Sequence, residues 1–298
     1  MCANSYDIIC LTETWLMEGI SDSELFDDRY LVWRRDRDYT STGQVMGGGV
    51  LVAVRRELVA TENRGWCSSA EDIWVTLTLH RKNPKVSYKM HLGVVYICNQ
   101  KLGNTLSEQL NEFSKGLMDV VLAHPADKFL VLGDFNQSNI VWQPLEDDIA
   151  LNPTNLVNSI QLNFIDNLNI CNLQQYNHYT NINNKILDLV LSNGEVSVGL
   201  PSDPLVIEDP HHKAICITTD FVQYHSLPVR PYVKFLYNLA DYDAIRSELD
   251  QVDWRQLPMC LKSVPNQINP SLHPARATER SSVEGRIVLS DTTTYYPP

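Results

Sequence analysis

Two polar side chains, Asp134 and Asn136, follow a short apolar run and have the types and spacing that hydrolytic chemistry needs. Residues 129–132 read Phe-Leu-Val-Leu, which is typical of a strand buried on both faces, and Gly133 ends the run. At the two-residue period of a strand, Asp134 and Asn136 lie on the same side, with Phe135 turned into the core. A carboxylate beside an amide can position and deprotonate a water. The same residues also fit a strand that runs into an Asx-type turn, so this stretch alone leaves both interpretations open.

Four more polar residues lie at or near the ends of other predicted strands, namely Glu13, Tyr96, Asp188 and His212. Taken singly, each has an ordinary structural interpretation, such as a turn acid for Glu13 or a core tyrosine for Tyr96. Strand ends on one edge of a sheet converge, so we expect the set to form one site. Carboxylates that hold a hard divalent cation, together with a His–Asp pair, suit metal-assisted phosphodiester hydrolysis.

Hydrophobic periodicity predicts the elements that must position these residues. Apolar or alternating runs predict strands at residues 7–11, 50–54, 73–80, 90–97, 129–132, 185–192 and 213–218. A capping box at Thr105 and Glu108 predicts a helix to about residue 124, and a second helix is expected over about residues 154–168. Three glycines at 47–49 precede the strand at 50–54 and predict a tight turn or a close backbone approach.

Composition and charge limit the function classes. A chain of 298 residues with 44% hydrophobic and 20% charged residues is typical of a folded protein with an ample core. No run approaches about 18 apolar residues, so we expect no membrane span, and the N-terminus does not resemble a signal peptide. Seven scattered cysteines without CxxC spacing indicate a reducing, intracellular protein. The net charge of −12 argues against nucleic-acid binding by the whole surface. A local basic surface, for which the arginines between residues 29 and 64 are candidates, or a metal ion would be needed.

Six motifs occur along the chain in a recognisable order. They are Leu11-Thr-Glu-Thr-Trp-Leu16, Gly47-Gly-Gly-Val-Leu-Val-Ala-Val54, Val95-Tyr-Ile97, Gly133-Asp-Phe-Asn136, Leu187-Asp-Leu-Val-Leu191 and His212-Lys-Ala-Ile215. Their order and type resemble the exonuclease-endonuclease-phosphatase superfamily, and more closely the apurinic-type endonuclease domain of jockey-like non-LTR retrotransposons. The resemblance covers about residues 5–222. It implies a DNase I-like, four-layered α/β sandwich in which two mixed β-sheets lie face to face with helices outside.

The resemblance also implies an activity and its requirements. It implies a Mg²⁺-dependent (or Mn²⁺-dependent) endonuclease that nicks DNA by phosphodiester hydrolysis. The nick would leave a 3′-hydroxyl for target-primed reverse transcription, in the nucleus and without a small-molecule cofactor. Glu13 would be the metal ligand, Asp134 would activate or position the attacking water, and Asn136 would orient that water.

The remaining site residues follow from the same motifs. His212 would contact the scissile phosphate, with Asp188 holding its imidazole in orientation and tautomer. Tyr96 would hydrogen-bond the phosphate, and Asn99 would contact the substrate backbone nearby. The family's Ser-Asp-His before the last strand reads Pro210-His-His212 here, so Asp209 is the candidate to replace the aspartate.

The ends of the chain depart from the family pattern. The family has a further strand carrying an Asn, and then a helix, before the strand that holds Glu13. We therefore expect an N-terminally truncated fragment with an exposed sheet edge, possessing an endonuclease-like domain over residues 1–222. Residues 223–258 resemble the connector towards a reverse transcriptase in such polyproteins, with a helix at about 238–249. The Ser-, Thr-, Pro- and Arg-rich residues 259–298 are expected to be poorly ordered.

Two other functions fit the sequence. The chain could be a catalytically impaired relic that acts as a binding module, which the missing first strand favours. It could also be a superfamily phosphatase that acts on inositol or lipid phosphates, which the retrotransposon-like connector disfavours.

Overall fold

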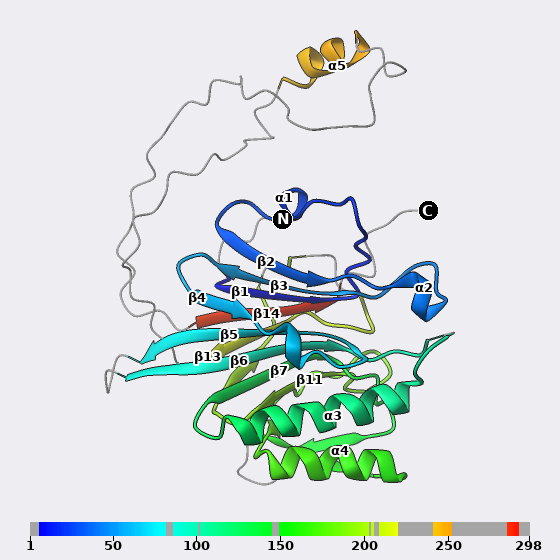
Figure 1. Cartoon of the computed structure of the whole chain (residues 1–298), viewed down its shortest axis with the longest axis vertical. Coiled ribbons are helices and arrows are strands. Elements are labelled where there is room, and N and C mark those ends of the chain that lie inside the picture. Colours follow the sequence, from blue (N-terminus) through cyan, green and yellow to red (C-terminus); the bar gives the residue numbers. More distant parts are fainter. Residues whose placement is uncertain are drawn as a thin grey trace. The chain divides into compact units, whose positions relative to one another are not determined.

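Two mixed β-sheets stacked face to face make up the main body of the protein (Figure 1). The computed structural model describes residues 6–81, 86–100, 102–144, 149–202, 204–205, 209–219, 241–251 and 285–291. Each sheet contains one parallel strand pair among antiparallel ones. The predicted fold class, a DNase I-like α/β sandwich of two mixed sheets, is confirmed.

The first sheet has six strands in the order β12-β13-β14-β1-β3-β2. Their bounds are β12 (Ser197–Gly199), β13 (Ile215–Thr219), β14 (Gly285–Asp291), β1 (Ile8–Thr12), β3 (Val50–Arg55) and β2 (Tyr30–Arg35). The second sheet has eight strands in the order β4-β5-β6-β7-β11-β10-β9-β8. Their bounds are β4 (Val59–Glu62), β5 (Glu71–Arg81), β6 (Val86–Tyr96), β7 (Lys128–Asp134), β11 (Asp188–Ser192), β10 (Gln174–Gln175), β9 (Leu151–Thr154) and β8 (Val141–Pro144).

The main core lies between the two sheets. Alternate residues of each strand point into it, for example Val50, Val52 and Val54 of β3 opposite Ile73 and Val75 of β5. Period-two alternation is what lets one strand serve two layers, because its other residues face outward. The polar residues that end these strands are thereby brought to the rim of the same interface.

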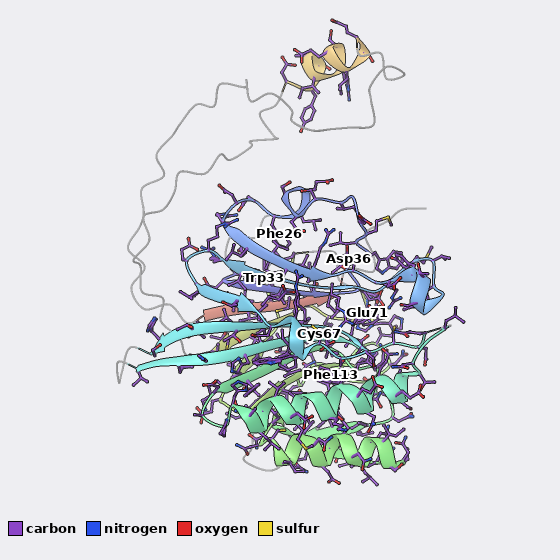
Figure 2. The ribbon with its side chains drawn as sticks, viewed as in Figure 1. Phe26, Trp33, Asp36, Cys67, Glu71 and Phe113 are labelled. Atoms are coloured by element: carbon purple, nitrogen blue, oxygen red, sulfur yellow. The ribbon has the colours of Figure 1, made fainter. Side chains whose placement is uncertain are left out.

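Two amphipathic helices cover the outer face of the eight-stranded sheet. Helix α3 (Leu106–Ala123) begins with the predicted capping box of Thr105 and Glu108, and Phe113 points from it towards the sheet (Figure 2). Helix α4 (Ser159–Ile170) starts later than the expected residue 154, because residues 151–154 form β9 and the Asn158 side chain caps the helix. The prediction of both helices is confirmed, and the predicted start of the second is wrong.

The outer face of the six-stranded sheet is covered mainly by loops. The single-turn helix α1 (Asp22–Leu25) lies in this layer, whereas α2 (Tyr39–Thr42) lies at the strand ends, where the Thr42 carbonyl accepts a hydrogen bond from the Leu102 N–H (Figure 1). A one-turn 3₁₀ helix, η1 (Arg64–Trp66), lies between β4 and β5 in sequence. Phe26, Leu16 and Tyr30 close a separate apolar cluster over β1, β3 and β14 (Figure 2). Within the described residues, extended helical cover is therefore confined to the eight-stranded sheet.

Strand β14 corrects two expectations at once. Residues 285–291 were expected to belong to a poorly ordered tail, yet they form a strand parallel to β1 and antiparallel to β13. The strand β1 was expected to present an exposed sheet edge, but β14 occupies that edge. The tail was expected to be poorly ordered because of its polar composition, although it contains the short apolar run Ile287-Val-Leu289. The burial of this run depends on partners distant in sequence.

Helix α5 (Tyr242–Asp250) belongs to a second compact unit, Pro228–Glu279. The Asp241 side chain caps it by accepting a hydrogen bond from the backbone N–H of Ala244. Its apolar residues Tyr242, Ile245 and Leu249 are exposed. The expected helix at about 238–249 is thus present from residue 242, while residues 220–240 lie outside the described part. No described helix is both long and apolar enough to cross a membrane.

A buried histidine on β6 predicts a pH dependence of folding stability. His91 contacts Asp127 (Nε2 to Oδ2, 2.9 Å) and Thr76 (Nδ1 to Oγ1, 2.8 Å), and the rings of His124 and Phe129 pack against it. Burial holds the pKa of His91 below its usual value, although the hydrogen bond to Asp127 acts in the opposite direction. The unfolded chain therefore binds a proton more readily, so stability should fall as pH decreases below about 6.5.

Urea unfolding at pH 7.5 and pH 5.5 checks this expectation. His91→Gln should reduce the loss of unfolding free energy over that interval, by at most about 1.4 kcal/mol per pH unit for one proton. His178→Gln, an exposed histidine changed in the same way, should leave the loss unaltered. Equal pH slopes for the parent and His91→Gln would contradict the assignment.

Candidate active site

One residue from each of four adjacent strands forms a row across the eight-stranded sheet. Glu71 of β5 is paired with Tyr96 of β6, and Tyr96 is paired with Asp134 of β7. Asp134 is in turn paired with Asp188 of β11. Neighbouring strands are about 4.8 Å apart, so the polar residues follow one another along the rim of the inter-sheet core. Three of these residues, Tyr96, Asp134 and Asp188, were expected to converge, whereas Glu71 was not among the predicted site residues.

Two hydrogen bonds join Asn136 to Asp134, and a third joins Asn136 to Ile97. The backbone N–H and the Nδ2 of Asn136 donate to the two carboxylate oxygens of Asp134, at 2.9 and 2.7 Å, and Nδ2 also donates to the Ile97 carbonyl at 2.8 Å. Asn136 takes a left-handed φ of 52°, which costs free energy unless such contacts hold it. Phe135 is fully buried, as predicted. The turn and catalytic interpretations coexist here, because an Asx-type contact fixes the carboxylate's orientation.

The position of Gly133 leaves no space for a side chain. Its φ is 142°, and a Cβ at this position would overlap the Val95 backbone of the neighbouring strand. The close approach of β6 and β7 at this point brings Tyr96 and Asp134 into register. A glycine is therefore required immediately before the carboxylate.

His212 and Asp188 form the predicted histidine–carboxylate pair. The His212 Nδ1 lies 3.1 and 3.3 Å from the two Asp188 oxygens. The Asn177 side chain donates to the Asp188 carbonyl at 2.7 Å and so anchors the start of β11. One ligand atom each of Asp134, Asp188 and His212 lies within 4.8 Å of the others. We call Asp134, Asn136, Asp188 and His212 the Asp134 cluster.

The turn before His212 shows the position of Asp209, the candidate to replace the aspartate for which this chain has His211. The Asp209 carboxylate accepts a hydrogen bond from the backbone N–H of His211 at 2.6 Å, and the Asp209 carbonyl accepts one from His212. Asp209 thus closes the turn that presents His212. His211 is exposed and lies outside the Asp134 cluster.

Glu13 is fixed by the backbone of the glycine loop, residues 47–49. Its Oε2 accepts hydrogen bonds from the Gly48 N–H and the Trp15 indole N–H, each at 2.7 Å. Glu13 and Trp15 both take left-handed φ values, 52° and 54°, in the turn after β1. All three glycines have positive φ, which confirms the predicted tight turn.

Arg37 and Glu71 complete the surroundings of Glu13, and sequence analysis assigned neither of them to the site. The Arg37 Nε donates to the Glu71 carboxylate in a buried ion pair, and Glu71 also accepts from the Gly49 N–H at 2.6 Å. A Cβ on Gly48 would overlap the Arg37 guanidinium. The sequence features that could have pointed to these two residues are local: Arg37 precedes the three glycines at 47–49, and Glu71 lies at the start of an alternating strand.

Tyr96 and Asn99 differ in their exposure to solvent. Tyr96 is buried, with the Arg37 guanidinium carbon 5.5 Å from its ring centroid. Asn99 is exposed, and its carbonyl accepts a hydrogen bond from Gln44 at 3.1 Å. Tyr96 is therefore part of the rim, and Asn99 remains available to solvent beside it.

Both Glu13 and Asp134 of the Asp134 cluster are close enough to the Cys98 thiol to affect its pKa. The pKa of Cys98 is raised to about 12, mainly by burial; Arg37 lowers it, and the carboxylates of Glu71, Glu13 and Asp134 contribute to the rise. Three carboxylates thus act on one buried group. Such a concentration of negative charge at a rim is what a hard divalent cation neutralises, since Mg²⁺ prefers carboxylate oxygens.

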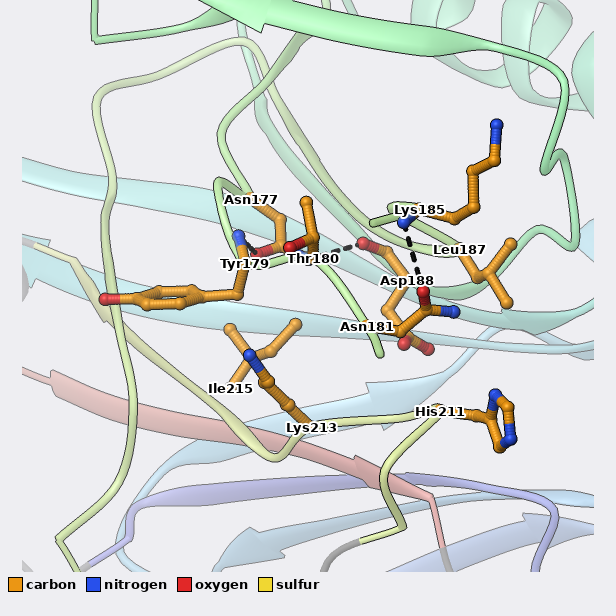
Figure 3. A pocket seen from close by; sticks show the side chains of 10 residues that line it. All are labelled: Asn177, Tyr179, Thr180, Asn181, Lys185, Leu187, Asp188, His211, Lys213 and Ile215. Carbon is orange, nitrogen blue, oxygen red and sulfur yellow. Dashed lines mark hydrogen bonds between the residues drawn. The ribbon is translucent and has the colours of Figure 1, made fainter. Parts of the chain in front are cut away.

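A small polar pocket lies directly beside Asp188 (Figure 3). Its lining combines amides, hydroxyls and two lysines, and comprises Asn177, Tyr179, Thr180, Asn181, Lys185, Leu187, Asp188, His211, Lys213 and Ile215. Sequence analysis did not single out the two cationic residues of this lining, Lys185 and Lys213. The Lys185 side chain extends away from the Asp188 carboxylate (Figure 3).

The arginines between residues 29 and 64 do not form the basic ridge that was considered for DNA. Six of them make ion pairs with acids: Arg29 with Asp27, Arg34 with Asp22 and Asp36, Arg35 with Asp72, Arg37 with Glu71, Arg55 with Asp7 and Arg64 with Glu62. Arg56 donates to the Asp28 carbonyl. The charge of this segment is therefore largely neutralised within the fold.

Fold and site together define a class: an α/β-sandwich protein with carboxylates, an amide and a histidine at the rim between its sheets. Residues 90–213 match the family model described as "Endonuclease-reverse transcriptase". Over this segment, the match confirms the expected resemblance to endonuclease–reverse transcriptase proteins. It supports a phosphodiester hydrolase of the nuclease type. Six predicted site residues fall within the matched segment, namely Tyr96, Asn99, Asp134, Asn136, Asp188 and His212, whereas Glu13 precedes it.

Solved structures of low sequence identity also align with the chain. The human Nocturnin catalytic domain with bound sulfate is 15% identical and covers 66% of this chain and 74% of its own, with a TM-score of 0.40. The endonuclease domain of TRAS1, a telomere-specific non-LTR retrotransposon, is 10% identical and covers 69% and 82%, with a TM-score of 0.43. D. rerio TDP2 complexed with a single-strand DNA product is 12% identical and covers 65% and 75%, with a TM-score of 0.35. No curated protein sequence matches the chain significantly.

Proposed function

We propose that this chain is a Mg²⁺- or Mn²⁺-dependent endonuclease that nicks DNA by phosphodiester hydrolysis. The observation that carries the proposal is the Asp134 cluster at the rim of the sandwich. It combines a hydrogen-bonded Asp134–Asn136 pair with a His212–Asp188 pair, and one ligand atom each of Asp134, Asp188 and His212 lies within 4.8 Å of the others. The cluster lies in the segment that matches endonuclease–reverse transcriptase proteins.

Each residue of the Asp134 cluster has a role that its contacts support. Asp134 accepts hydrogen bonds from Asn136 on both oxygens, so the carboxylate is oriented to take a proton from an attacking water. Asp188 contacts the His212 Nδ1 and so fixes the orientation of the imidazole, whose Nε2 is the proposed donor to a phosphate oxygen. Tyr96, next in the row, would hydrogen-bond the same phosphate.

A divalent cation fits the carboxylates at this rim. Glu13 is the proposed ligand, and its oxygen is already oriented by the Gly48 N–H. When bound, the cation would neutralise phosphate charge and stabilise the pentacovalent centre. The fixed contacts of Glu13 and Asp134 mean that the chain itself supplies preorganised oxygen donors.

We propose that the biological reaction is the first cut in target-primed reverse transcription. A hydrolytic nick that leaves a 3′-hydroxyl would supply the primer, and the enzyme would act in the nucleus where target DNA lies. The resemblance of residues 223–258 to a connector leading towards a reverse transcriptase supports this role. Asn99, exposed at the rim, is proposed to contact the DNA backbone.

A plasmid-nicking assay tests the proposed activity. The chain should convert supercoiled plasmid to open circles with Mg²⁺ and lose that activity with EDTA. His212→Ala should slow nicking by about 10²-fold or more, the usual contribution of a positioned acid or base. His211→Ala, the adjacent exposed histidine, should retain the parent rate within a few-fold. A DNA polymerase should extend the nick directly if it carries a 3′-hydroxyl.

Three results would redirect the assignment. A folded chain without nicking would favour the relic or binding module. Phosphate release from inositol phosphates without nicking would favour a superfamily phosphatase. Equal loss of activity in His211→Ala and His212→Ala would remove the special role given to His212.

Two lysines, Lys185 and Lys213, line the same pocket as Asp188 and predict a local contribution to DNA binding. Lys185→Ala and Lys213→Ala should each weaken binding and lower the slope of log K against log salt by about 0.9. Lys128→Ala, at the opposite end of β7, is the matched control and should leave the slope unchanged. Anisotropy titrations of a duplex oligonucleotide in EDTA would measure all three. Identical slopes for the parent and both pocket variants would contradict the contact.

A further inference from the structure

Strand β14 occupies an unusual place for residues near the end of the sequence. It lies between β1 and β13, in the interior of the six-stranded sheet (Figure 1). Gly285 is paired with Thr219 of β13, although about 65 residues separate them in sequence. Antiparallel neighbours are usually joined by about 2–5 residues. The chain therefore leaves the sheet at residue 219 and returns to the same position at residue 285.

Both faces of β14 are buried. Ile287 and Leu289 belong to the core between the sheets, whereas Val288 belongs to the cluster on the outer face. All three side chains and Ser290 are at most 3% exposed. A strand buried on both sides contributes apolar area to two cores, so its removal would expose both at once.

The register of β14 connects the two parts of the candidate site. Asp291 is paired with Thr12, the residue directly before Glu13. Leu289 is paired with Ile215, three residues after His212. In the described part of the sheet, β14 is the strand that joins β1 to β13. Without it, the strand leading to Glu13 and the strand following His212 would share no hydrogen-bonded neighbour.

We propose that β1 and β13 form a strand-accepting slot whose occupant is residues 285–291 of the same chain. Insertion of this segment completes the sheet and fixes Glu13 relative to His212. The C-terminal strand is thus a positioning element of a site whose other residues lie before residue 213. The part of the proposal that concerns activity rests on the proposed nuclease function, whereas the placement of the strand does not.

A cysteine crosslink tests the placement. Val288 is directly opposite Cys216, which is in no disulfide, in the antiparallel pair of β14 and β13. Opposed Cα atoms in such a pair are about 4.5–5.5 Å apart, within the range that a disulfide spans. Oxidised full-length Val288→Cys should form an intramolecular disulfide between Cys216 and the introduced cysteine, detected by peptide mapping. The double variant Cys216→Ser/Val288→Cys is the control and should not form it.

The outcomes of this crosslink are decisive. A monomeric chain with that disulfide and an unchanged circular-dichroism spectrum supports intramolecular insertion. Crosslinked dimers would show that the slot takes the strand of a second copy, and a folded chain without the disulfide would show that the slot does not hold residue 288. Either of the last two results overturns the proposal.

A pair of matched core variants tests the effect on the site. Leu289→Ala and Leu77→Ala remove the same side chain from the same inter-sheet core, and both residues are at most 2% exposed. Leu77 lies about 20 Å along β5 from Glu71, whereas Leu289 is paired with Cys10, close to Glu13. Both variants should lower the melting temperature. Leu289→Ala alone should raise, several-fold, the Mg²⁺ concentration needed for half-maximal nicking.

These measurements separate the two proposals. An equal Mg²⁺ requirement in both variants would overturn the positioning role of β14 and leave the nuclease function intact. Formation of the crosslink by Val288→Cys, together with no DNA nicking by the parent chain, would overturn the nuclease function and leave the inserted strand intact.

Discussion

Asp134→Asn is expected to slow DNA nicking by about 10³-fold while the chain remains folded. The substitution keeps the size of the side chain but removes the charge that would accept the water's proton. Asn136 donates to both oxygens of Asp134, and an amide at position 134 can accept only one of those two bonds. The loss therefore combines a missing base with a loosened Asn136, which is already held at a left-handed φ of 52°.

The control for this variant is Asp166→Asn, the same change at an exposed position of α4. It should nick DNA at the parent rate. Single-turnover rates with saturating DNA and Mg²⁺ would separate chemistry from binding, and urea unfolding would verify that the Asp134→Asn chain is native. Nicking by folded Asp134→Asn at the parent rate would exclude Asp134 as the base and restore the purely structural interpretation of the turn.

Arg37→Met is expected to destabilise the chain by about 3–5 kcal/mol, the usual cost of leaving one partner of a buried ion pair unpaired. The Arg37 and Glu71 side chains are 2% and 8% exposed. Glu71 also accepts the Gly49 N–H, and Gly48 of the same loop orients Glu13. Loss of the guanidinium should therefore disturb the glycine loop and reduce nicking along with stability.

A double variant and a surface pair control this prediction. In Arg37→Met/Glu71→Gln no buried charge remains, and the amide oxygen can still accept from Gly49, so a large part of the lost stability should return. Arg64→Met breaks an ion pair of similar length, 2.8 Å to Glu62, but the Arg64 side chain is 86% exposed. That change should have no measurable effect on stability. Urea unfolding of the four chains would check these expectations. A double variant less stable than Arg37→Met would show that the pair does not act through its buried charge.

The Asp134 stretch was readable from the sequence because all of its information is local. An apolar run, a glycine and two polar residues at period two predict a strand end with its polar residues on one side. The structure places Asp134 and Asn136 in hydrogen-bond contact and buries Phe135, as expected. The capping box at Thr105 and the tight turn at the three glycines were local signals of the same kind.

The Arg37–Glu71 pair and the strand β14 were missed for a common reason. Each depends on partners that are distant in sequence: 34 positions between Arg37 and Glu71, and nearly the whole chain between β1 and β14. An arginine in a charged loop has the same local pattern whether it faces solvent or a buried glutamate. Likewise, a short apolar run inside a polar, Ser- and Thr-rich tail does not indicate by itself that it will be buried between two other strands.

In the sequence, periodicity and the capping box predicted the two long helices and the strand end at Asp134, because these are local properties. The resemblance of six motifs to a known family implied the sandwich class and the residues of the Asp134 cluster. Their convergence was an expectation that the order of motifs supported. Only the tertiary structure decided the register that aligns Glu71, Tyr96, Asp134 and Asp188 in one row. It also decided that most of the basic segment is neutralised by ion pairs, and that the last strand of the chain joins the first. These features depend on which strands become neighbours, and that choice is made by burial across the whole fold.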